Sequence, residues 1–367
     1  MPSSARSGGL GEQYPAGATA NPALQPGGPY DAAVRVIIYG AGAVGSVIGG
    51  RLRQGAADVV LVARPAHAGA IHQAGLALRT ARGAQIVDID AVTSIAQLTP
   101  TDGDVVVITA KTQDTAALHA DLLEWNPAAA VVCATNGVEH ERMALRRFAR
   151  VYGMVVQLPV QFEKPGEVTV LCGPTNAILD VGCYPSGIDE TAVDLAALLD
   201  ASPGILSEAD DDVMTKKYGK LLVNLGNVAD AACGIAGRGT RVVAAAIEEG
   251  KKAYQAAGIC WEQSPERSER YKARAATMQF DIPSGDTFVG GSTWQSLMKG
   301  ATSLETDFFN GEILLLARLH GLPAPANEFL QQYATRMLRG EVAAGSRSTD
   351  QLDAEWERLS ETAESRF

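Results

Sequence analysis

The hydrophobic pattern of the first half of the chain changes period repeatedly. Between residues 34 and 158, short apolar runs rich in β-branched residues alternate with longer stretches in which apolar positions recur at helical spacing. Short runs of this kind are typical of buried strands, and the longer period is typical of helices. We expect strands at 34–39, 59–63, 104–109, 130–134 and 151–158, a helical stretch that follows the glycines at 40–45 and runs to about Gln54, and helices at 66–76, 112–124 and 138–148. This alternation indicates a parallel sheet with helices on both faces.

The second half of the chain has a different pattern. Short β-like runs at 168–171 and 176–181 precede an expected helix at 187–199 and a last strand near Ile205. Beyond Glu208, the segments with helical period are 209–232, 239–257, 263–279, 293–299, 303–320 and 324–339. The pattern predicts an α/β domain at 33–207, then an all-helical C-terminal domain at 208–345. A polar tail with one helical turn or more is expected at 346–367.

The N-terminal segment, 1–32, fits neither pattern. Its first 30 residues contain five Pro and six Gly among Ser and Ala, without apolar periodicity, so we expect a disordered arm. They have no basic start followed by an apolar core, so a secretory signal is not expected. A net charge of −11 would repel a polyphosphate backbone, and no run of 18 apolar residues occurs. Neither a nucleic acid nor a membrane is therefore an expected partner.

The five cysteines are widely spaced and form no Cys-x-x-Cys pair. The composition, 46% hydrophobic and 20% charged, is ordinary for a soluble globular protein. We expect buried free thiols in a reducing compartment, the cytoplasm, with neither a disulfide framework nor a metal site.

A glycine-rich motif directly follows the first expected strand. It comprises Gly40, Ala41, Gly42, Ala43, Val44 and Gly45. Gly40 permits a tight turn, Gly42 allows the backbone to approach a pyrophosphate, and Gly45 lets a helix pack closely on the strand. With a strand before it, a helix after it and a second strand beyond, the motif predicts a Rossmann-type dinucleotide-binding domain. A tight turn without a ligand is the alternative.

The end of the second expected strand bears on the choice of cofactor. NAD-binding enzymes usually place an acidic residue there to accept hydrogen bonds from the ribose 2′-hydroxyl. This chain has Arg64 instead. A guanidinium can hold a 2′-phosphate in a forked, charge-assisted contact, so we expect NADPH as the cofactor. The alternative is that Arg64 is a solvated loop charge.

Polar motifs recur after later strands and on the helices of the second domain. They are Thr-Ala-Lys-Thr-Gln at 109–113, Thr-Asn-Gly at 135–137, Lys-Leu-Leu-Val-Asn at 220–224, Ser-Thr-Trp-Gln at 292–295 and Leu-Glu-Thr-Asp-Phe-Phe-Asn-Gly at 304–311. In this order and spacing they resemble the 2-dehydropantoate 2-reductase (ketopantoate reductase) family. The resemblance implies NADPH-dependent reduction of a 2-oxo acid, with 2-dehydropantoate and pantothenate biosynthesis as the expected case. It also makes a homodimer plausible.

Lys220 is the expected general acid. Hydride transfer to a ketone leaves an alkoxide that needs a proton or a positive charge near its oxygen, and Lys220 can supply either. Asn224 shares a helix face with Lys220, and its amide could hold a substrate hydroxyl or carboxylate. The resemblance gives proton donation to Lys220 and makes Glu305 a catalytic partner that bonds the substrate and orients the lysine. The alternatives are a solvated lysine and a helix-surface carboxylate.

The resemblance also implies the remaining site residues. Thr293 stands where the family has a serine that binds the substrate carboxylate, and Ser292 beside it is a further expected substrate contact. Lys111 and Asn136 match positions near the nicotinamide ribose and the hydride-transfer site. As alternatives, Thr293 caps the following helix, and Asn136 belongs to a turn with Gly137.

The match is imperfect beyond Asn224. The family usually has a second asparagine four residues later, followed by proline, whereas this chain has Val228 and Ala229. Asn227, also expected to bind substrate, is one residue early, so on a continuous helix it would point about 100° away. One lost hydrogen bond is worth roughly 0.5–1.5 kcal/mol. The substrate is therefore expected to be a small 2-oxo acid, either 2-dehydropantoate or a related compound.

Two other functions are open alternatives. An opine-type dehydrogenase shares this domain arrangement but typically uses a histidine–aspartate pair, for which the second domain offers no plausible candidate. A non-enzymatic NADPH-binding sensor would keep the glycine motif and Arg64 but would need neither Lys220 nor Glu305. Amine-dependent NADPH oxidation would indicate the first, and a pathway role that survives loss of Lys220 would indicate the second.

Overall fold

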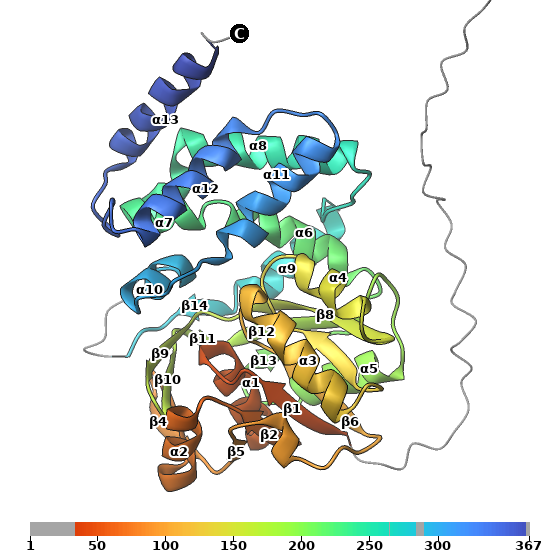
Figure 1. Ribbon diagram of the computed structural model, residues 1–367. Coiled ribbons are helices and arrows are strands. Elements are labelled where there is room, and N and C mark those ends of the chain that lie inside the picture. The colour runs from red at the N-terminus through yellow and green to blue at the C-terminus, as the bar shows by residue number, and fades with distance from the viewer. Residues whose placement is uncertain (1–33, 264, 284–289, 365–367) are drawn as a thin grey trace, which may run out of the picture. The chain divides into compact units, whose positions relative to one another are not determined.

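The computed structural model describes residues 34–263, 265–283 and 290–364. The expected arm at 1–32 and the last three residues of the expected tail lie outside the described residues. The chain up to residue 206 contains both strands and helices, and helices dominate from residue 213 (Figure 1). The expected fold class, a Rossmann-type parallel-sheet region followed by a helical C-terminal region, is confirmed.

The main sheet of the α/β region has eight strands in the order β13-β12-β8-β7-β6-β1-β2-β5. All strands from β8 to β5 in this order are parallel, whereas β12 runs antiparallel to β8, and β13 is parallel to β12. The six parallel strands have the order typical of dinucleotide-binding domains. The strands are β1 Arg35–Tyr39, β2 Asp58–Val62, β5 Asp90–Val92, β6 Asp104–Ile108, β7 Ala130–Cys133, β8 Arg150–Gln157, β12 Ala177–Cys183 and β13 Ile205–Leu206.

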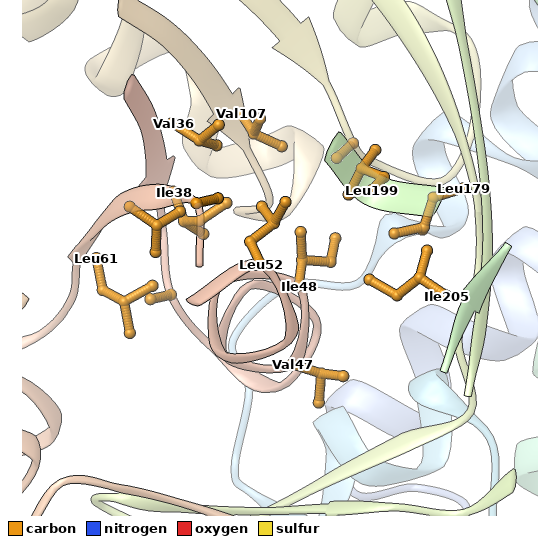
Figure 2. Close-up of a cluster of buried hydrophobic side chains, with 14 of the residues drawn as sticks. Val36, Ile38, Val47, Ile48, Leu52, Leu61, Val107, Leu179, Leu199 and Ile205 are labelled. Carbon is orange, nitrogen blue, oxygen red and sulfur yellow. The ribbon is translucent and has the colours of Figure 1, made fainter. Parts of the chain in front are cut away.

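Helices cover both faces of this sheet, so its central strands are buried on both sides. Along β1, Val36 and Ile38 belong to one hydrophobic cluster, and Ile37 and Tyr39 belong to another. On the face of the sheet that carries Val36 and Ile38, side chains of α1 pack beside residues of β1, β2 and β6 (Figure 2). The helices of this region are α1 Ala43–Gln54, α2 Pro65–Ala74, α3 Thr115–Trp125, α4 Glu139–Leu145 and α5 Glu190–Asp200, with short 3-10 turns η1 Ile95–Gln97 and η2 Thr112–Asp114.

A second sheet, of which the hydrophobic pattern predicts only the run at 168–171, packs against α1. Its order is β4-β3-β10-β9, with β3 Leu76–Thr80, β4 Gly83–Val87, β9 Val160–Lys164 and β10 Glu167–Val170. The outer strand β4 was missed because it is almost entirely exposed and carries little apolar periodicity. Polar edge strands of this kind give a weak signal in a sequence.

The helical region is built around a separate core that includes Tyr254, Phe309 and Tyr333. Its helices α8, α11 and α12 pack against one another (Figure 1). The elements are α6 Val213–Asn224, α7 Asn227–Cys233, η3 Ile235–Gly239, α8 Arg241–Ala256, α9 Pro265–Ala275, α10 Ser292–Met298, η4 Glu305–Phe308, α11 Asn310–Leu319, α12 Pro325–Leu338 and α13 Thr349–Glu364.

The single helix expected at 209–232 is wrong, because the chain breaks between α6 and α7. Gly226, a poor helix former, is the N-cap of α7. The side-chain amide of Asn310 donates to the carbonyl of Leu225, so this buried backbone group at the break has a partner. The angle expected for Asn227 assumed a continuous helix and does not apply.

The helix expected at 263–279 is also partly wrong. α9 ends at Ala275, and β14 Met278–Phe280 pairs antiparallel with β11 Cys172–Pro174 of the α/β region. Arg274 on α9 forms a forked ion pair with Asp180 of β12, at 2.7 and 3.0 Å, and the Asp180 side chain is fully buried. The segment from Arg274 to β14 therefore returns from the helical region and bonds to strands β12 and β11 of the α/β region.

The C-terminal segment forms α13 and ties back to the helical core. The carboxylate of Asp353 accepts hydrogen bonds from the backbone amides of Arg241 and Val242, at 3.0 Å each. These amides begin α8, so a residue more than 100 positions later caps that helix. Leu352 is fully buried beside it.

Two composition-based expectations can be compared with the structure. All five cysteines are free, but Cys260 is exposed, so the expectation of buried thiols is wrong for that residue. Within the described ranges, no helix is long and apolar enough to cross a bilayer.

Candidate active site

The glycine motif forms the turn between β1 and α1. Gly40 has φ 95°, which favours glycine, and a Cβ there would lie 2.9 Å from the backbone nitrogen of Ala110. A Cβ on Gly45 would lie 2.4 Å from Thr109 Oγ1, so α1 could not pack as closely on the sheet. Gly40 and Gly45 are thus required by the packing of the protein itself.

Gly42 is different, because a Cβ there would meet only a carbonyl oxygen at 3.8 Å. Protein packing does not require a glycine at this position, whereas a close ligand would. α1 starts at Ala43 without a side-chain cap, so the helix N-terminus can offer backbone N–H groups to an anion. The motif residues, with Ala41, Ala43 and Val44 between the glycines, fit the pyrophosphate of a dinucleotide.

Arg64 is the N-cap residue of α2 and is exposed at the end of β2. Its backbone carbonyl accepts hydrogen bonds from His67 and Ala68, which fixes the start of the helix. Within the described part of the chain, no protein partner is found for its guanidinium. The group is therefore accessible beside the edge of the sheet where a cofactor ribose would lie.

Two expected site residues follow the adjacent strands β6 and β7. Lys111 lies after β6, and its Nζ donates to Ser296 Oγ of α10 at 2.6 Å. Asn136 lies after β7, and its Oδ1 accepts a hydrogen bond from Lys220 Nζ of α6. Gly137, at φ 80°, passes close to the Phe308 carbonyl, where a Cβ would lie 3.2 Å away. The carboxyl ends of these strands therefore meet the helical region.

Lys220 is the central cation of this junction. Burial lowers its pKa to about 7, the positive charge of Lys217 contributes to the lowering, and the negative charge of Glu305 acts in the opposite direction. A lysine with a pKa near 7 can donate a proton at neutral pH far more readily than a solvated one. Lys220 is half-buried and bonded to Asn136, which distinguishes its surroundings from those of a fully solvated lysine.

Glu305 is the first residue of η4 and lies opposite Lys111 and Lys220. Burial raises the pKa of its carboxyl group. The charge of Lys111, a hydrogen bond from the backbone of Thr112 and the charge of Lys220 act against this rise. The residue is thus part of the same electrostatic group as both lysines, and not an isolated carboxylate on a helix surface.

Asn224 ends α6, one helical turn beyond Lys220. Only 8% of it is exposed, and its side-chain nitrogen has no hydrogen-bond partner among the described residues. A buried amide donor without a partner costs about 1–3 kcal/mol, and a ligand oxygen would remove that cost. The position is consistent with a polar contact to a substrate.

Asn227 is not free in the same way. Its Oδ1 accepts a hydrogen bond from Arg238 at 2.8 Å, and Arg238 also forms an ion pair with the buried Asp230 at 2.9 Å. Its side-chain oxygen is therefore held within the protein. Val228, which stands at the family's asparagine position, is only 1% exposed and packs in the helical core.

The two hydroxyl residues at the start of α10 differ in environment. Thr293 is buried, whereas Ser292 is exposed, and the Ser292 carbonyl accepts a hydrogen bond from Ser296. The N-cap of α10 is Gly291, so the alternative that Thr293 caps this helix is wrong. α10 packs against α7, the helix that begins at Asn227.

Sequence reasoning missed several residues of this junction. Lys217 and Glu141 form a buried ion pair beside Lys220, Ser296 holds Lys111, and Arg238 pairs with Asp230. A second lysine three residues before Lys220 was visible as a helical neighbour. Its partner Glu141, 76 positions away, carries no such signal. In the described ranges, no group of three or more His, Cys, Asp or Glu side chains could hold a metal ion.

The strand order, the glycine turn and the half-buried Lys220, which bonds Asn136 after β7, fit one class: a nicotinamide dinucleotide-dependent oxidoreductase acting on CH–OH groups. Residues 36–185 match the family described as Ketopantoate reductase PanE/ApbA, and residues 212–337 match its C-terminal part, Ketopantoate reductase PanE/ApbA C terminal. The chain belongs to the ketopantoate reductase family.

Individual relatives agree with this membership. A 2-dehydropantoate 2-reductase of Pyrococcus horikoshii is 26% identical over 310 residues, which cover 81% of this chain and 95% of the relative. The crystal structure of a ketopantoate reductase from Ralstonia eutropha JMP134 has a TM-score of 0.68 and 25% identity, covering 84% of this chain and 99% of that one. D-mandelate dehydrogenase with NADH and anilino(oxo)acetate shares the fold, with a TM-score of 0.67, 20% identity and the same coverage.

Proposed function

We propose that the protein reduces a 2-oxo acid to a 2-hydroxy acid with NADPH. The observation that carries the proposal is the position of Lys220: its ammonium bonds Asn136 at the end of β7 and lies in the electrostatic range of Glu305. Family membership supports the reaction class. A bound reduced nicotinamide would supply the hydride, and the roles below concern the protein's own side chains.

Lys220 is proposed to hydrogen-bond the substrate ketone and to protonate its oxygen as negative charge develops there. Glu305 would orient the ammonium and contact the substrate, and Asn224 would donate its unpartnered amide N–H to a substrate oxygen. Thr293, with Ser292 beside it, would contact the carboxylate at the start of α10. These contacts would position the ketone carbon close to the cofactor.

The preference for NADPH rests on Arg64. Its exposed guanidinium at the end of β2 could receive a 2′-phosphate, and no acidic residue occupies that position. Gly40, Gly42 and Gly45 with the N-terminus of α1 would hold the pyrophosphate. Lys111 and Asn136 would lie near the nicotinamide ribose.

Among 2-oxo acids, we propose 2-dehydropantoate first, because curated relatives with this activity cover most of the chain. The product would be pantoate, and the enzyme would act in pantothenate biosynthesis in the cytoplasm. A second candidate is a related 2-oxo acid. The absence of the family's second amide at Val228 favours it, and Asn227 is already bonded to Arg238.

The test is NADPH oxidation, followed by absorbance, with 2-dehydropantoate and a panel of branched, hydroxylated and aromatic 2-oxo acids. The proposal predicts turnover with at least one of them and a lower KM for NADPH than for NADH. No turnover with any 2-oxo acid would reject it. Turnover only when an amine is added would indicate an opine-type dehydrogenase instead.

A further inference from the structure

Two lysines extend from one face of α6 towards the end of β7. Lys217 and Lys220 are three residues apart, so they lie on the same side of the helix. Lys217 Nζ donates to the carbonyls of Cys133 at 3.3 Å and Thr135 at 3.0 Å, and to the carboxylate of Glu141. Lys220 Nζ donates to Asn136, the next residue along the chain. The end of β7 thus holds both ammonium groups.

The two side chains also border the same small cavity. Its volume is about 10 Å³, and both lysines line it together with Thr135, Asn136, Gly137, Met154, Val155 and Val156. A cavity of this size has room for about one water molecule. Because the two side chains share so small a cavity, their charges are screened less than charges on an open surface.

Lys217 is held in a buried ion pair with Glu141. Its side chain is only 3% exposed, and that of Glu141 is fully buried. Three acceptors surround the nitrogen, which is the full donor capacity of an ammonium group. It therefore has no donor left for a substrate, so its influence on the reaction must pass through Lys220.

We propose that Lys217 is a positioning residue for the reduction: its fixed positive charge repels the proton on Lys220 and promotes transfer of that proton to the substrate oxygen. This inference rests on the proposed function. In the step, an N–H bond of Lys220 breaks and an O–H bond forms on the oxygen of the reduced ketone. Lys220 is left neutral, which relieves the repulsion between the two groups.

The other titratable groups around the pair do not reverse this effect. Burial lowers the pKa of His140 far below its usual value and raises the pKa of the Cys133 thiol, so both are neutral at physiological pH. Glu141 partly offsets the charge of Lys217, and Arg142 beside it is paired with Glu312.

On the substrate side, Glu305 favours the charged form of Lys220, and Lys111 faces Glu305. The lowered pKa of Lys220, to which Lys217 contributes after burial, agrees with a net repulsion. The two influences on Lys220 therefore come from different elements and have opposite signs: Lys217 acts from its own helix and Glu305 from η4.

The experiment compares full-length K217M with wild type and with K251M. Lys251 lies on α8, is 40% exposed and pairs with Glu248, so K251M is a matched loss of a lysine away from the site. Lysines labelled with ¹³C at Cε are titrated by NMR in each protein, and the Lys220 signal is assigned from its loss in K220R. The pH profile of kcat/KM is then measured with the best 2-oxo acid.

The inference predicts that Lys220 titrates about one pH unit higher or more in K217M, since a like charge has been removed, and at its wild-type pH in K251M. The pH at which kcat/KM falls on the alkaline side should rise by the same amount. K217R, which keeps the charge, should restore the wild-type titration. An unchanged Lys220 titration in K217M would overturn the inference.

K217M leaves Glu141 buried without its partner and could unfold the protein. The double variant K217M/E141Q removes both charges and keeps the test decisive. In it, we expect the pH at which Lys220 titrates to rise again, by a smaller amount than in K217M. An unshifted Lys220 signal in the double variant would contradict the inference, and so would an unshifted signal in a folded K217M. A shifted signal in a protein that reduces no 2-oxo acid would instead reject the proposed function.

Discussion

The chemistry of Lys220 depends on conflicting demands on one side chain. Burial and the charge of Lys217 disfavour the ammonium form, whereas Glu305 favours it. The balance leaves a pKa of about 7, where the group is both substantially protonated and a competent proton donor at neutral pH. A solvated lysine, with an ordinary pKa near 10.4, would be charged but a much weaker acid.

Replacement of Lys220 by alanine should therefore act on the chemical step. We expect kcat to fall by about 10²–10⁴-fold, the usual contribution of a general acid, with little change in the KM for NADPH. Steady-state kinetics measure both. Equal effects on kcat and on the NADPH KM would contradict the assignment, because they would indicate a damaged cofactor site.

Arg64 allows a separate prediction for the cofactor. In R64A, the Kd for NADPH should rise about tenfold or more through loss of a charge-assisted contact. The Kd for NADH should stay unchanged, because NADH lacks the 2′-phosphate. Titration of cofactor fluorescence measures both constants, with R82A, an exposed arginine in the β3–β4 turn, as the control. Equal losses for both cofactors would argue against a 2′-phosphate contact.

The residues of the site differed in how far the sequence could predict them. Gly40, Gly42 and Gly45 were readable because their spacing follows from a local turn, whose geometry involves only neighbours in the chain. Lys220 and Glu305 required the resemblance to a family, since 85 residues separate them. The Lys217–Glu141 pair could not be predicted, because it depends on how α6 crosses the end of β7.

At the level of elements, glycines in helices have opposite functions depending on their neighbours. Gly45 in α1 leaves no room for a methyl group, with Thr109 Oγ1 at 2.4 Å and Ile38 Cγ2 at 2.8 Å from its ideal Cβ. Gly69 in α2 has nothing within 4 Å of its ideal Cβ. The first sets the distance between helix and sheet, whereas the second is a solvated position in a helix.

Matched substitutions should separate the two cases. G45A should destabilise the fold by about 1–3 kcal/mol, as expected for overpacking, and weaken dinucleotide binding because α1 must shift. G69A should be neutral or stabilise the fold by up to about 1 kcal/mol, because alanine is the better helix former. Thermal unfolding measures both changes. A G45A protein as stable as wild type would show that α1 can move away from β1 without cost.

The cap supplied by α13 can be tested in the same way. D353A should lower the free energy of unfolding by about 1 kcal/mol, the typical worth of a capping side chain, because two amides at the start of α8 lose their acceptor. D350A, an exposed Asp→Ala change on the same helix, is the control and should have a smaller effect. Urea denaturation gives both values, and equal losses would argue against the cap.

The elements themselves were predicted best where burial imposes a clear period. The central strands are buried on both faces and therefore appear as continuous apolar runs. β4 is nearly all exposed, and β14 owes its conformation to pairing with β11, so neither has a pattern of its own. The break at Gly226 was hidden because apolar positions continue across it and Asn310 supports it from another helix.

For the whole molecule, the state of Lys220 links stability to pH. Its pKa is about 7 in the folded protein and near the ordinary 10.5 in the unfolded chain, so the unfolded chain binds more protons between these values. The free energy of unfolding should therefore rise with pH across this window, relative to a K220M variant that lacks the group.

Urea unfolding of wild type and K220M at several pH values between about 6 and 10 measures this difference. Below the folded pKa, the lysine is charged in both states and its burial penalty is present in full. The penalty is lost progressively as the pH rises. A constant difference between the two proteins across the range would show that Lys220 has an ordinary pKa in the folded state.

The pairing of β14 with β11 has a mechanical consequence for the two regions. The chain passes from the α/β region into the helical region at 207–212 and returns to bond the α/β region through Arg274 and β14. The two regions are therefore joined by the covalent chain at one point and by non-covalent bonds at another. Any separation of the regions has to break the β11–β14 pairing and the Arg274–Asp180 ion pair as well as bend the connecting chain.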